Sequence, residues 1–209
     1  SIDEGWFGTF KVMVPELVAH GLPATIYSTS YYTEKQLPVF GVALDYLLSR
    51  SESKAVDLGL LGGGLPGQFQ LATAEDREIL AEHLEEYASR LDAYDGFQLL
   101  ERLSKQLDVE FQPLVENRVF HLMTCDEIKE AARKGIDIQL HTHRHRFPLD
   151  DPSLLQQELQ ANRSVLNALT AKPLRHFCYP SGVWSPLAFS VLQKAGIESA
   201  VTTEQGLNF

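Results

Sequence analysis

Four short segments rich in β-branched and aromatic residues recur along this chain and alternate with helix-like stretches. They are residues 24–28, 136–140, 176–179 and 199–202. Segments of this composition, bounded by turn residues, are typical of strands. Strands that alternate with helices usually run parallel and are joined by right-handed crossovers. The pattern predicts an α/β fold whose strands end at one common rim, where the catalytic groups of such folds gather.

Helix signals fill the gaps between these strands. Residues 10–20 carry apolar side chains at helical spacing and are followed by Gly21, a common helix stop. Thr124 and Glu127 form a capping-box pattern, which predicts a helix that runs to Lys134. Residues 151–169 and 186–194 repeat the helical spacing.

A mainly helical insertion is predicted at about residues 33–118, with helices over 39–50, 74–91 and 96–107. The glycine-rich run 62–67 lacks the Lys-Ser/Thr ending of a phosphate-binding loop, so we expect a flexible connector there. At 209 residues and 44% hydrophobic content, one catalytic domain over 1–209 that carries this insertion is sufficient.

Composition excludes several classes of partner. The net charge of −10 argues against nucleic acid and anionic membrane surfaces, which recruit basic patches. A sugar polymer that is neutral, or becomes cationic after reaction, is compatible with it. Cys125 and Cys178 are too few for a disulfide framework, so we expect free thiols, with a single bridge as the alternative. The sequence has no apolar stretch of membrane-spanning length.

Metal-ligand residues follow the strand predicted to end at residue 140. The run His141-Thr142-His143-Arg144-His145 can place two imidazoles on one ion. Asp3 and Glu4 at the start of the chain offer a carboxylate, and Gly5 lets the chain turn after them. Two histidines and one carboxylate leave coordination positions open, as in catalytic metal sites. A proton-sensitive patch or satisfied core histidines are the alternatives.

Three segments resemble motifs of one family, in the family's order. Residues 1–5 (Ser-Ile-Asp-Glu-Gly) resemble T-F-D-D-G, residues 141–145 resemble H-[ST]-x-x-H, and residues 178–182 (Cys-Tyr-Pro-Ser-Gly) resemble a variant of R-x-P-Y-G. These motifs belong to the polysaccharide deacetylases, a carbohydrate esterase family that includes the nodulation-type chitooligosaccharide deacetylases. The chain most resembles the family's exopolysaccharide deacetylase-like branch. Residues 21–27 resemble the family's second strand and residues 200–208 a late strand and loop. The resemblance implies a distorted, incomplete (β/α) barrel with a helical insertion.

The resemblance also implies roles for individual residues. Asp3 would be the general base, and Glu4, His141 and His145 would hold a divalent metal, Zn²⁺ with Co²⁺, Ni²⁺ or Mn²⁺ as alternatives. Glu4 is one methylene longer than the family's usual Asp. The backbone N–H of Ser181 would stabilise the oxyanion. Residues expected to bind substrate or support the site are Thr142, His143, Tyr179, Pro180, Gly182 and Trp184.

Two departures from the family pattern bear on the chemistry. Cys178 stands where the family commonly has an arginine that orients the base; Arg175 or Arg144 could supply that charge, or Cys178 could be a small buried residue. The family's late L-x-H motif, whose histidine protonates the leaving amine, has no match. We expect it in a segment beyond this chain, or another acid such as His121 or His176. A segment is also expected before Ser1.

The predicted function is removal of N-acetyl groups from amino-sugar residues of an exopolysaccharide, a chitin-like polymer or peptidoglycan. The expected partner is therefore an acetylated amino-sugar polymer or oligosaccharide. The alternatives are an O-acetyl esterase acting on a xylan-like polymer, and a catalytically impaired carbohydrate-binding protein of the same fold. An amidohydrolase barrel is a further alternative, with His141 and His143 as its H-x-H pair.

Overall fold

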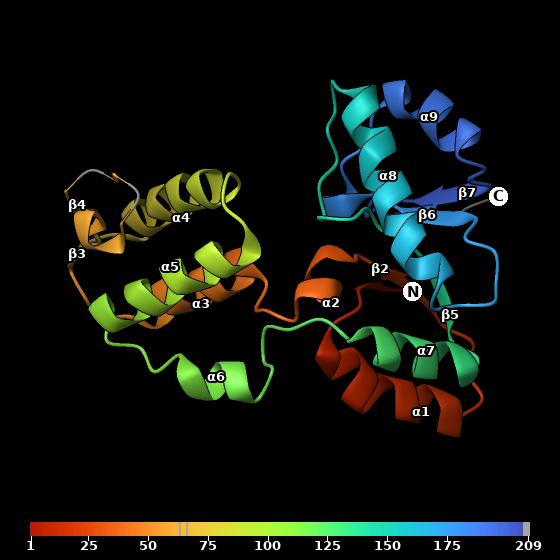
Figure 1. Cartoon of the computed structure of the whole chain (residues 1–209), viewed down its shortest axis with the longest axis horizontal. Coiled ribbons are helices and arrows are strands. Elements are labelled where there is room, and N and C mark those ends of the chain that lie inside the picture. Colours follow the sequence, from red (N-terminus) through yellow and green to blue (C-terminus); the bar gives the residue numbers. More distant parts are fainter. Residues whose placement is uncertain (63, 66, 207–209) are drawn as a thin grey trace. The chain divides into compact units, whose positions relative to one another are not determined.

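The computed structural model describes residues 1–62, 64–65 and 67–206 and divides the chain into two compact units (Figure 1). The first unit comprises Ser1–Gln36 and Leu122–Phe209, and the second comprises Leu37–His121. The second unit thus coincides closely with the insertion expected at 33–118. That the whole chain forms one catalytic domain stays a prediction.

A five-stranded parallel sheet, ordered β1-β2-β5-β6-β7, forms the centre of the first unit. Its strands are β1 (Ile2–Glu4), β2 (Thr25–Ser28), β5 (Asp137–Leu140), β6 (His176–Cys178) and β7 (Ser199–Val201). The four strands predicted from composition are confirmed to within one residue at each end. Together with its helices, this sheet is the incomplete (β/α) barrel that the sequence predicts.

Helices cover the sheet of the first unit, as the alternating pattern requires. They are α1 (Val14–Ala19), α2 (Tyr31–Lys35), α7 (Cys125–Arg133), α8 (Pro152–Asn167) and α9 (Phe189–Lys194). In Figure 1, α1 and α7 lie side by side, and the Lys134 ammonium after α7 lies over the ring of Phe10 before α1. The predicted capping box is present, since Thr124 and Glu127 exchange hydrogen bonds of 2.7 and 3.1 Å.

Two helix predictions need correction in detail. Residues 9–13 form a π-helical turn (Thr9–Met13) ahead of α1, where a continuous α-helix was expected. Leu154 is one of the apolar residues in the stretch 151–169, and its regular spacing predicts burial, but it is 43% exposed because it lies in the first turn of α8, off the buried face. Leu155, Leu159 and Leu166 carry the buried stripe instead.

The core of the first unit lies between the sheet and these helices. Ile26, Ile138, Leu140 and Phe177, one or two from each of three neighbouring strands, are fully buried. A parallel sheet covered by helices buries its strands, which explains why these segments read as apolar runs. Within the described part of the chain, no helix combines the length and the apolar character needed to cross a bilayer.

The contact between β5 and β6 is unusually narrow. One residue pair, Leu140 with Phe177, links the two strands in register. The buried side chain of Gln139 extends the link, because its Oε1 accepts the backbone N–H groups of Arg175 and His176 at 2.9 Å each. A side-chain amide therefore replaces part of the backbone ladder at this position.

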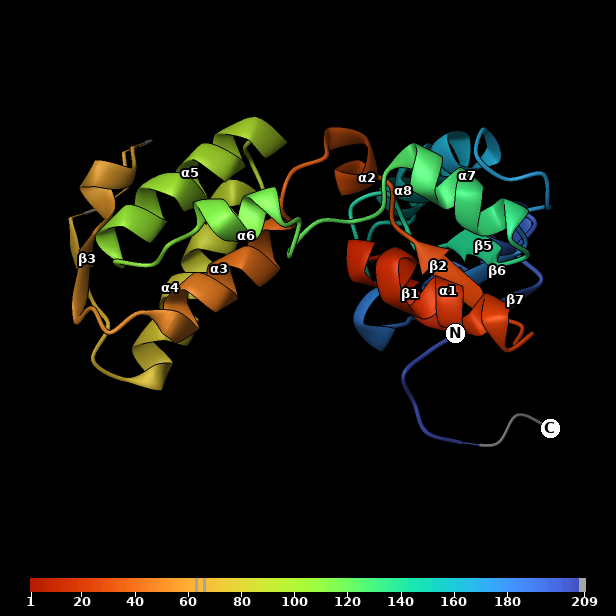
Figure 2. The same cartoon turned by 90° about the horizontal axis from the view of Figure 1, so that it is seen from below.

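The second unit is mainly helical (Figure 2). Its helices are α3 (Phe40–Arg50), α4 (Ala74–Ala88), α5 (Ala93–Gln106) and α6 (Gln112–Glu116). Helix α3 packs against both α4 and α5, and Leu80 and Leu84 of α4 are fully buried.

An antiparallel hairpin of β3 (Ala55–Asp57) and β4 (Gln68–Gln70) in the second unit was not predicted. With three residues in each strand, it is too short to give a periodic signal. The connector expected at 62–67 joins these strands, and residues 63 and 66 of it lie outside the described part of the chain.

Replacing Gln139 with leucine should destabilise the first unit. The Gln139→Leu change leaves the N–H groups of Arg175 and His176 without their acceptor, and each unpaired, partly buried group costs about 1–3 kcal/mol. We expect the free energy of unfolding to fall by about 2–4 kcal/mol. Urea unfolding followed by tryptophan fluorescence measures this change, because Trp6 and Trp184 both belong to the first unit.

The matched control is Gln157→Leu on the exposed face of α8, which should change the unfolding free energy by less than about 0.5 kcal/mol. An unchanged urea midpoint in Gln139→Leu would show that its amide does not hold β5 to β6.

Candidate metal centre

The carboxyl ends of the parallel strands bring distant segments of the sequence to one rim. Strands β1, β2, β5 and β6 end at Glu4, Ser28, Leu140 and Cys178. The residues at or just after these ends include all three motifs singled out in the sequence. The expected convergence at one edge of the sheet is therefore observed.

Glu4, His141 and His145 form a compact group of three possible metal ligands at this rim. The Oε1 atom of Glu4 lies 3.3 Å from Nε2 of His145 and 3.9 Å from Nε2 of His141. Both Nε2 atoms are buried, and neither has a hydrogen-bond partner among the described residues. The two imidazoles hold the pKa of the Glu4 carboxyl well below its usual range, although partial burial opposes them.

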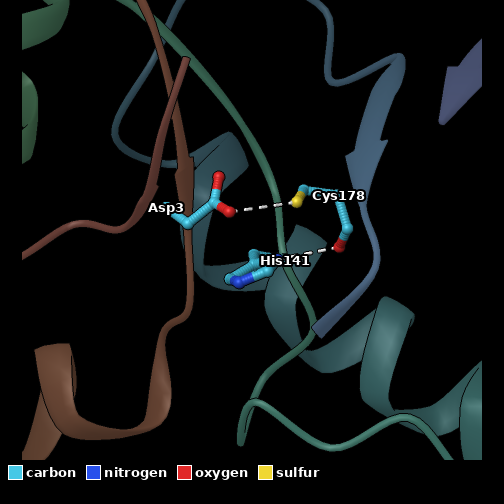
Figure 3. Close-up of side chains that lie close together, drawn as sticks. All are labelled: Asp3, His141 and Cys178. Carbon is cyan, nitrogen blue, oxygen red and sulfur yellow. Dashed lines mark hydrogen bonds between the residues drawn. The ribbon is translucent and has the colours of Figure 1, made fainter. Parts of the chain in front are cut away.

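A backbone contact fixes which nitrogen of His141 is free. Its Nδ1 lies 2.8 Å from the carbonyl oxygen of Cys178 (Figure 3). A carbonyl oxygen only accepts, so Nδ1 of the neutral ring carries the proton and Nε2 carries the lone pair. Metal-binding histidines are commonly oriented by such a second hydrogen bond. His141 is thus prepared to act as a ligand through Nε2, the atom nearest Glu4.

These three side chains fit a divalent cation. Two imidazole nitrogens and one carboxylate are a donor set that zinc and similar metals accept. Burial of an unpaired nitrogen is costly unless something else satisfies it, and a cation between the three donors would do so. The side chains of Glu4 and His145 are 29% and 35% exposed, which leaves one side of the group open to water or substrate.

The rim contains several residues in left-handed backbone conformations. Glu4, Thr142, His145 and Ser181 have φ values of 56° to 61°. This region costs a residue with a side chain about 1 kcal/mol, and residues held there cluster at functional sites. At Gly5, with φ of 85°, a Cβ atom would lie 3.0 Å from Oγ of Ser28, so the turn after β1 requires glycine.

Asp3 lies beside Cys178 (Figure 3). The thiol Sγ is 3.4 Å from Oδ2 of Asp3, and the two side chains point toward one another. Burial, and secondarily the Asp3 carboxylate, raises the pKa of the Cys178 thiol to about 12. The thiol therefore stays protonated at neutral pH and donates a hydrogen bond to Asp3. Asp3, Cys178 and His141 also form a second group with ligand atoms close to one another.

Arg175 and Arg144 were considered as replacements for the arginine that the family has at position 178. Among the described residues, neither forms an ion pair with Asp3. Arg175 pairs with Glu198 at 2.8 Å, and Arg144 pairs with Glu158 at 3.0 Å. The neutral thiol of Cys178 is thus the group that contacts Asp3 from the position where the family has arginine. Both cysteines are free, as expected.

Ser181 lies in the turn after β6 and has a left-handed backbone conformation. Residues Pro180–Gly182 form a 3₁₀ turn, whose first N–H groups lie outside its own hydrogen bonding. At Gly182, with φ of 70°, a Cβ atom would lie 2.0 Å from Oγ1 of Thr203. Glycine is therefore required here.

Thr142 and His143, which lie between the two candidate ligands, make other contacts at the rim. Nδ1 of His143 lies 2.8 Å from Oγ of Ser30, and His143 belongs to neither group of possible metal ligands. Oγ1 of Thr142 accepts the N–H of Arg146 at 3.1 Å and so braces the loop from within. The H-x-H pairing expected of an amidohydrolase barrel is not formed among the described residues.

The two aromatic residues proposed for substrate contact differ in position. Tyr179 is buried, and its ring packs edge-on against Phe147 and Phe177, each at 5.1 Å. Trp184 is 41% exposed, stacks on Phe189 at 5.9 Å, and lines a hollow of about 410 Å³ beside β7. Tyr179 lines the same hollow, but Trp184 is the more exposed of the two side chains.

His176, one of the two histidines considered as a general acid, lies away from the rim. His176 begins β6, at the strand end opposite the rim, and its Nδ1 lies 2.8 Å from Oγ of Ser199. His121 belongs to the second unit, and burial lowers its pKa to about 4. The general acid is therefore not assigned.

Sequence reasoning missed two buried polar residues on α8. Glu158 and Asn162 are 4% and 0% exposed and contact the histidine segment. Their signal was present, because they interrupt the apolar stripe of this helix at helical spacing. Polar residues buried among leucines require specific partners, which the sequence alone does not identify.

Comparison with known proteins relates part of this rim to one protein family. The model of the polysaccharide deacetylase family matches residues 102–200, which include the histidine segment and the turn after β6 but not Asp3 and Glu4. This match identifies a polysaccharide deacetylase domain over residues 102–200. Among curated proteins, no significant match was found.

Solved structures show the same fold at low identity. The deacetylase PplD of Streptococcus pyogenes, in complex with acetate, is 14% identical with a TM-score of 0.54, over 98% of this chain and 54% of that chain. The deacetylase domain of BpsB from Bordetella bronchiseptica is 13% identical with a TM-score of 0.52, over 98% and 62%. This chain therefore spans between half and two thirds of the length of these two chains.

The burial of Cys178 predicts its reactivity. With a pKa of about 12, about one thiol in ten thousand is ionised at pH 8, and only the thiolate reacts with iodoacetamide. We expect Cys178 to stay unmodified in the native protein and to react after unfolding in urea, as peptide mass spectrometry would measure. Cys125, which is half-buried, is the internal comparison. Equal labelling of Cys178 with and without urea would contradict its buried, protonated state.

Proposed function

We propose that this protein is a metal-dependent deacetylase that removes N-acetyl groups from amino-sugar residues of a polysaccharide. One observation carries the proposal: two buried, unpaired Nε2 atoms face the carboxylate of Glu4, with the proposed base Asp3 on the same rim. The match of residues 102–200 to the polysaccharide deacetylase model supports deacetylation, and the donor set supports a divalent metal, Zn²⁺ in the first instance.

In this proposal Glu4, His141 and His145 hold the cation. When bound, a divalent cation supplies Lewis acidity that polarises an acetyl carbonyl and lowers the pKa of water. The open side of the group, next to the partly exposed Glu4 and His145, gives access to the acetyl group.

Asp3 is the proposed general base, which takes a proton from the attacking water. The Cys178 thiol donates to Oδ2 and leaves Oδ1 of the same carboxylate available for that proton. Attack on the acetyl carbon generates a tetrahedral oxyanion on the substrate. The N–H of Ser181, held by the left-handed turn before Gly182, is the proposed donor to that oxyanion.

The substrate assignment rests on the family and on charge. The chain carries a net charge of −10, which suits a product that gains amino groups and becomes cationic. We favour amide over ester cleavage because of the motif resemblance to N-deacetylases. An acetylated exopolysaccharide, a chitin-like polymer and peptidoglycan all present the required group.

Two substitutions separate the proposed roles. Asp3→Asn should keep the metal and lower acetate release from acetylated chitooligosaccharide by about 10²- to 10⁴-fold, because it removes the base alone. His141→Ala should lose both metal and turnover, because it removes one of the three proposed ligands. Metal content by mass spectrometry and acetate release by a coupled assay measure the two effects.

The control is His176→Ala, which lies at the far end of β6 and should retain both properties. Full turnover in Asp3→Asn would remove the assigned base, and unchanged metal content in His141→Ala would remove the assigned site. Faster acetate release from acetylated xylan than from chitooligosaccharide would replace the amide substrate with an ester.

A carbohydrate-binding protein without catalytic activity is the second candidate. It is favoured by one observation, the neutral contact that Cys178 makes where the family has a charged arginine. This candidate predicts binding of chitooligosaccharide with no acetate release, even in the presence of added Zn²⁺ or Co²⁺.

A further inference from the structure

Helix α8 presents two polar side chains on its buried face. Glu158 and Asn162 are four residues apart and so lie on the same side of the helix, between Leu155, Leu159 and Leu166. A buried amide or carboxylate costs several kcal/mol unless its hydrogen bonds are satisfied. The partners of these two residues therefore indicate what their burial achieves.

Asn162 connects the ends of β2 and β5. Its Oδ1 accepts the backbone N–H of His141 at 3.0 Å. Its Nδ2 donates to the carbonyl oxygen of Ser28 and to Oγ of Ser30, both at 3.0 Å. These three contacts require one acceptor oxygen and two N–H donors on the same side chain. An amide provides this combination, and no other side chain of that size does.

Glu158 holds the other end of the histidine segment. Its Oε2 accepts the backbone N–H of Arg144 at 2.7 Å, and its Oε1 accepts Nη1 of the same residue at 3.0 Å. The Arg144 guanidinium also lies over the ring of Tyr31, 5.1 Å from its centre. Arg144 directly precedes His145, so this contact restrains the position of the second histidine ligand.

The segment between these two contacts is strained. Thr142 and His145 have φ values of 61° and 57°, which side-chain-bearing residues adopt only when surrounding contacts impose them. Side chains of α8 accept hydrogen bonds from this segment at two points, the backbone N–H groups of His141 and Arg144. Among the described side chains, only Asn162 accepts the N–H of His141 and only Glu158 accepts the N–H of Arg144.

We propose that Asn162 and Glu158 are positioning residues for the metal centre. One face of α8 fixes the backbone at both ends of the histidine segment, so that Nε2 of His141 and Nε2 of His145 face Glu4 before a cation binds. Ordering of the loop then takes place during folding and does not weaken metal binding. This inference rests on the proposed function, because it requires that these histidines bind a metal.

Asn162→Leu tests the first contact. Leucine has a similar volume but leaves the His141 N–H without an acceptor. We expect the Kd for Zn²⁺, measured on the folded protein by competition with a chromophoric chelator, to rise by about 10- to 100-fold. Circular dichroism establishes that the variant is folded.

Glu158 provides the second variant and its rescue. Glu158→Leu should weaken Zn²⁺ binding by a similar factor, whereas Glu158→Gln keeps an oxygen for the Arg144 N–H and should stay within about threefold of the native Kd. If Glu158 acted only through general stability, Glu158→Leu and Glu158→Gln would not differ in their Kd for Zn²⁺. If Asn162→Leu fails to fold, this pair carries the test alone.

Two control substitutions on α8 separate positioning from stability. Leu166→Ala removes a buried core side chain and should lower the thermal midpoint while leaving the Zn²⁺ affinity of the folded protein within about twofold. Asn167→Leu, at the exposed end of the helix, should change neither quantity.

The outcomes are distinguishable. Native-like Zn²⁺ affinity in both Asn162→Leu and Glu158→Leu would overturn the inference while leaving the proposed function intact. The inference would also be overturned if Leu166→Ala weakened Zn²⁺ binding as much as Asn162→Leu and Glu158→Leu. If the native protein binds no Zn²⁺ at all, the proposed function fails and this inference fails with it.

Discussion

The hydrogen bond from Nδ1 of His141 to the carbonyl oxygen of Cys178 is the interaction on which the geometry of the candidate metal centre depends. It sets the tautomer of a fully buried imidazole and so decides that the lone pair faces Glu4. Since the bond crosses from β5 to β6, the ligand geometry follows from the pairing of two strands. A side chain whose orientation is imposed by the backbone of a neighbouring strand needs no rearrangement to bind a cation.

The rim combines strained turns with a rigid sheet below them. Glu4, Thr142, His145 and Ser181 all adopt left-handed conformations, and each lies at or just after the end of a strand. Isolated loops would relax out of such conformations. The buried strands, with Ile26, Ile138 and Phe177 in the core, hold the ends of these turns in place.

Much of this arrangement could be predicted from the sequence. The strands were found because parallel, buried strands read as short apolar runs, and the candidate ligands were found because motif spacing survives where overall identity is low. The hairpin β3–β4 was missed because strands of three residues carry no periodicity. Asn162 and Glu158 were missed for another reason, since the partner of a buried polar residue is a tertiary contact that no local pattern encodes. The replacement of arginine by Cys178 was visible, but its bond to Asp3 was not.

The narrow seam between β5 and β6 divides the rim into two parts of different chemistry. Glu4, His141 and His145 stand on one side of it, while Cys178 and Ser181 stand on the other. One backbone pair, the amide of Gln139 and the imidazole of His141 span the boundary. A shift of the His141 ring would therefore also disturb its contact with the carbonyl oxygen of Cys178, three residues before Ser181.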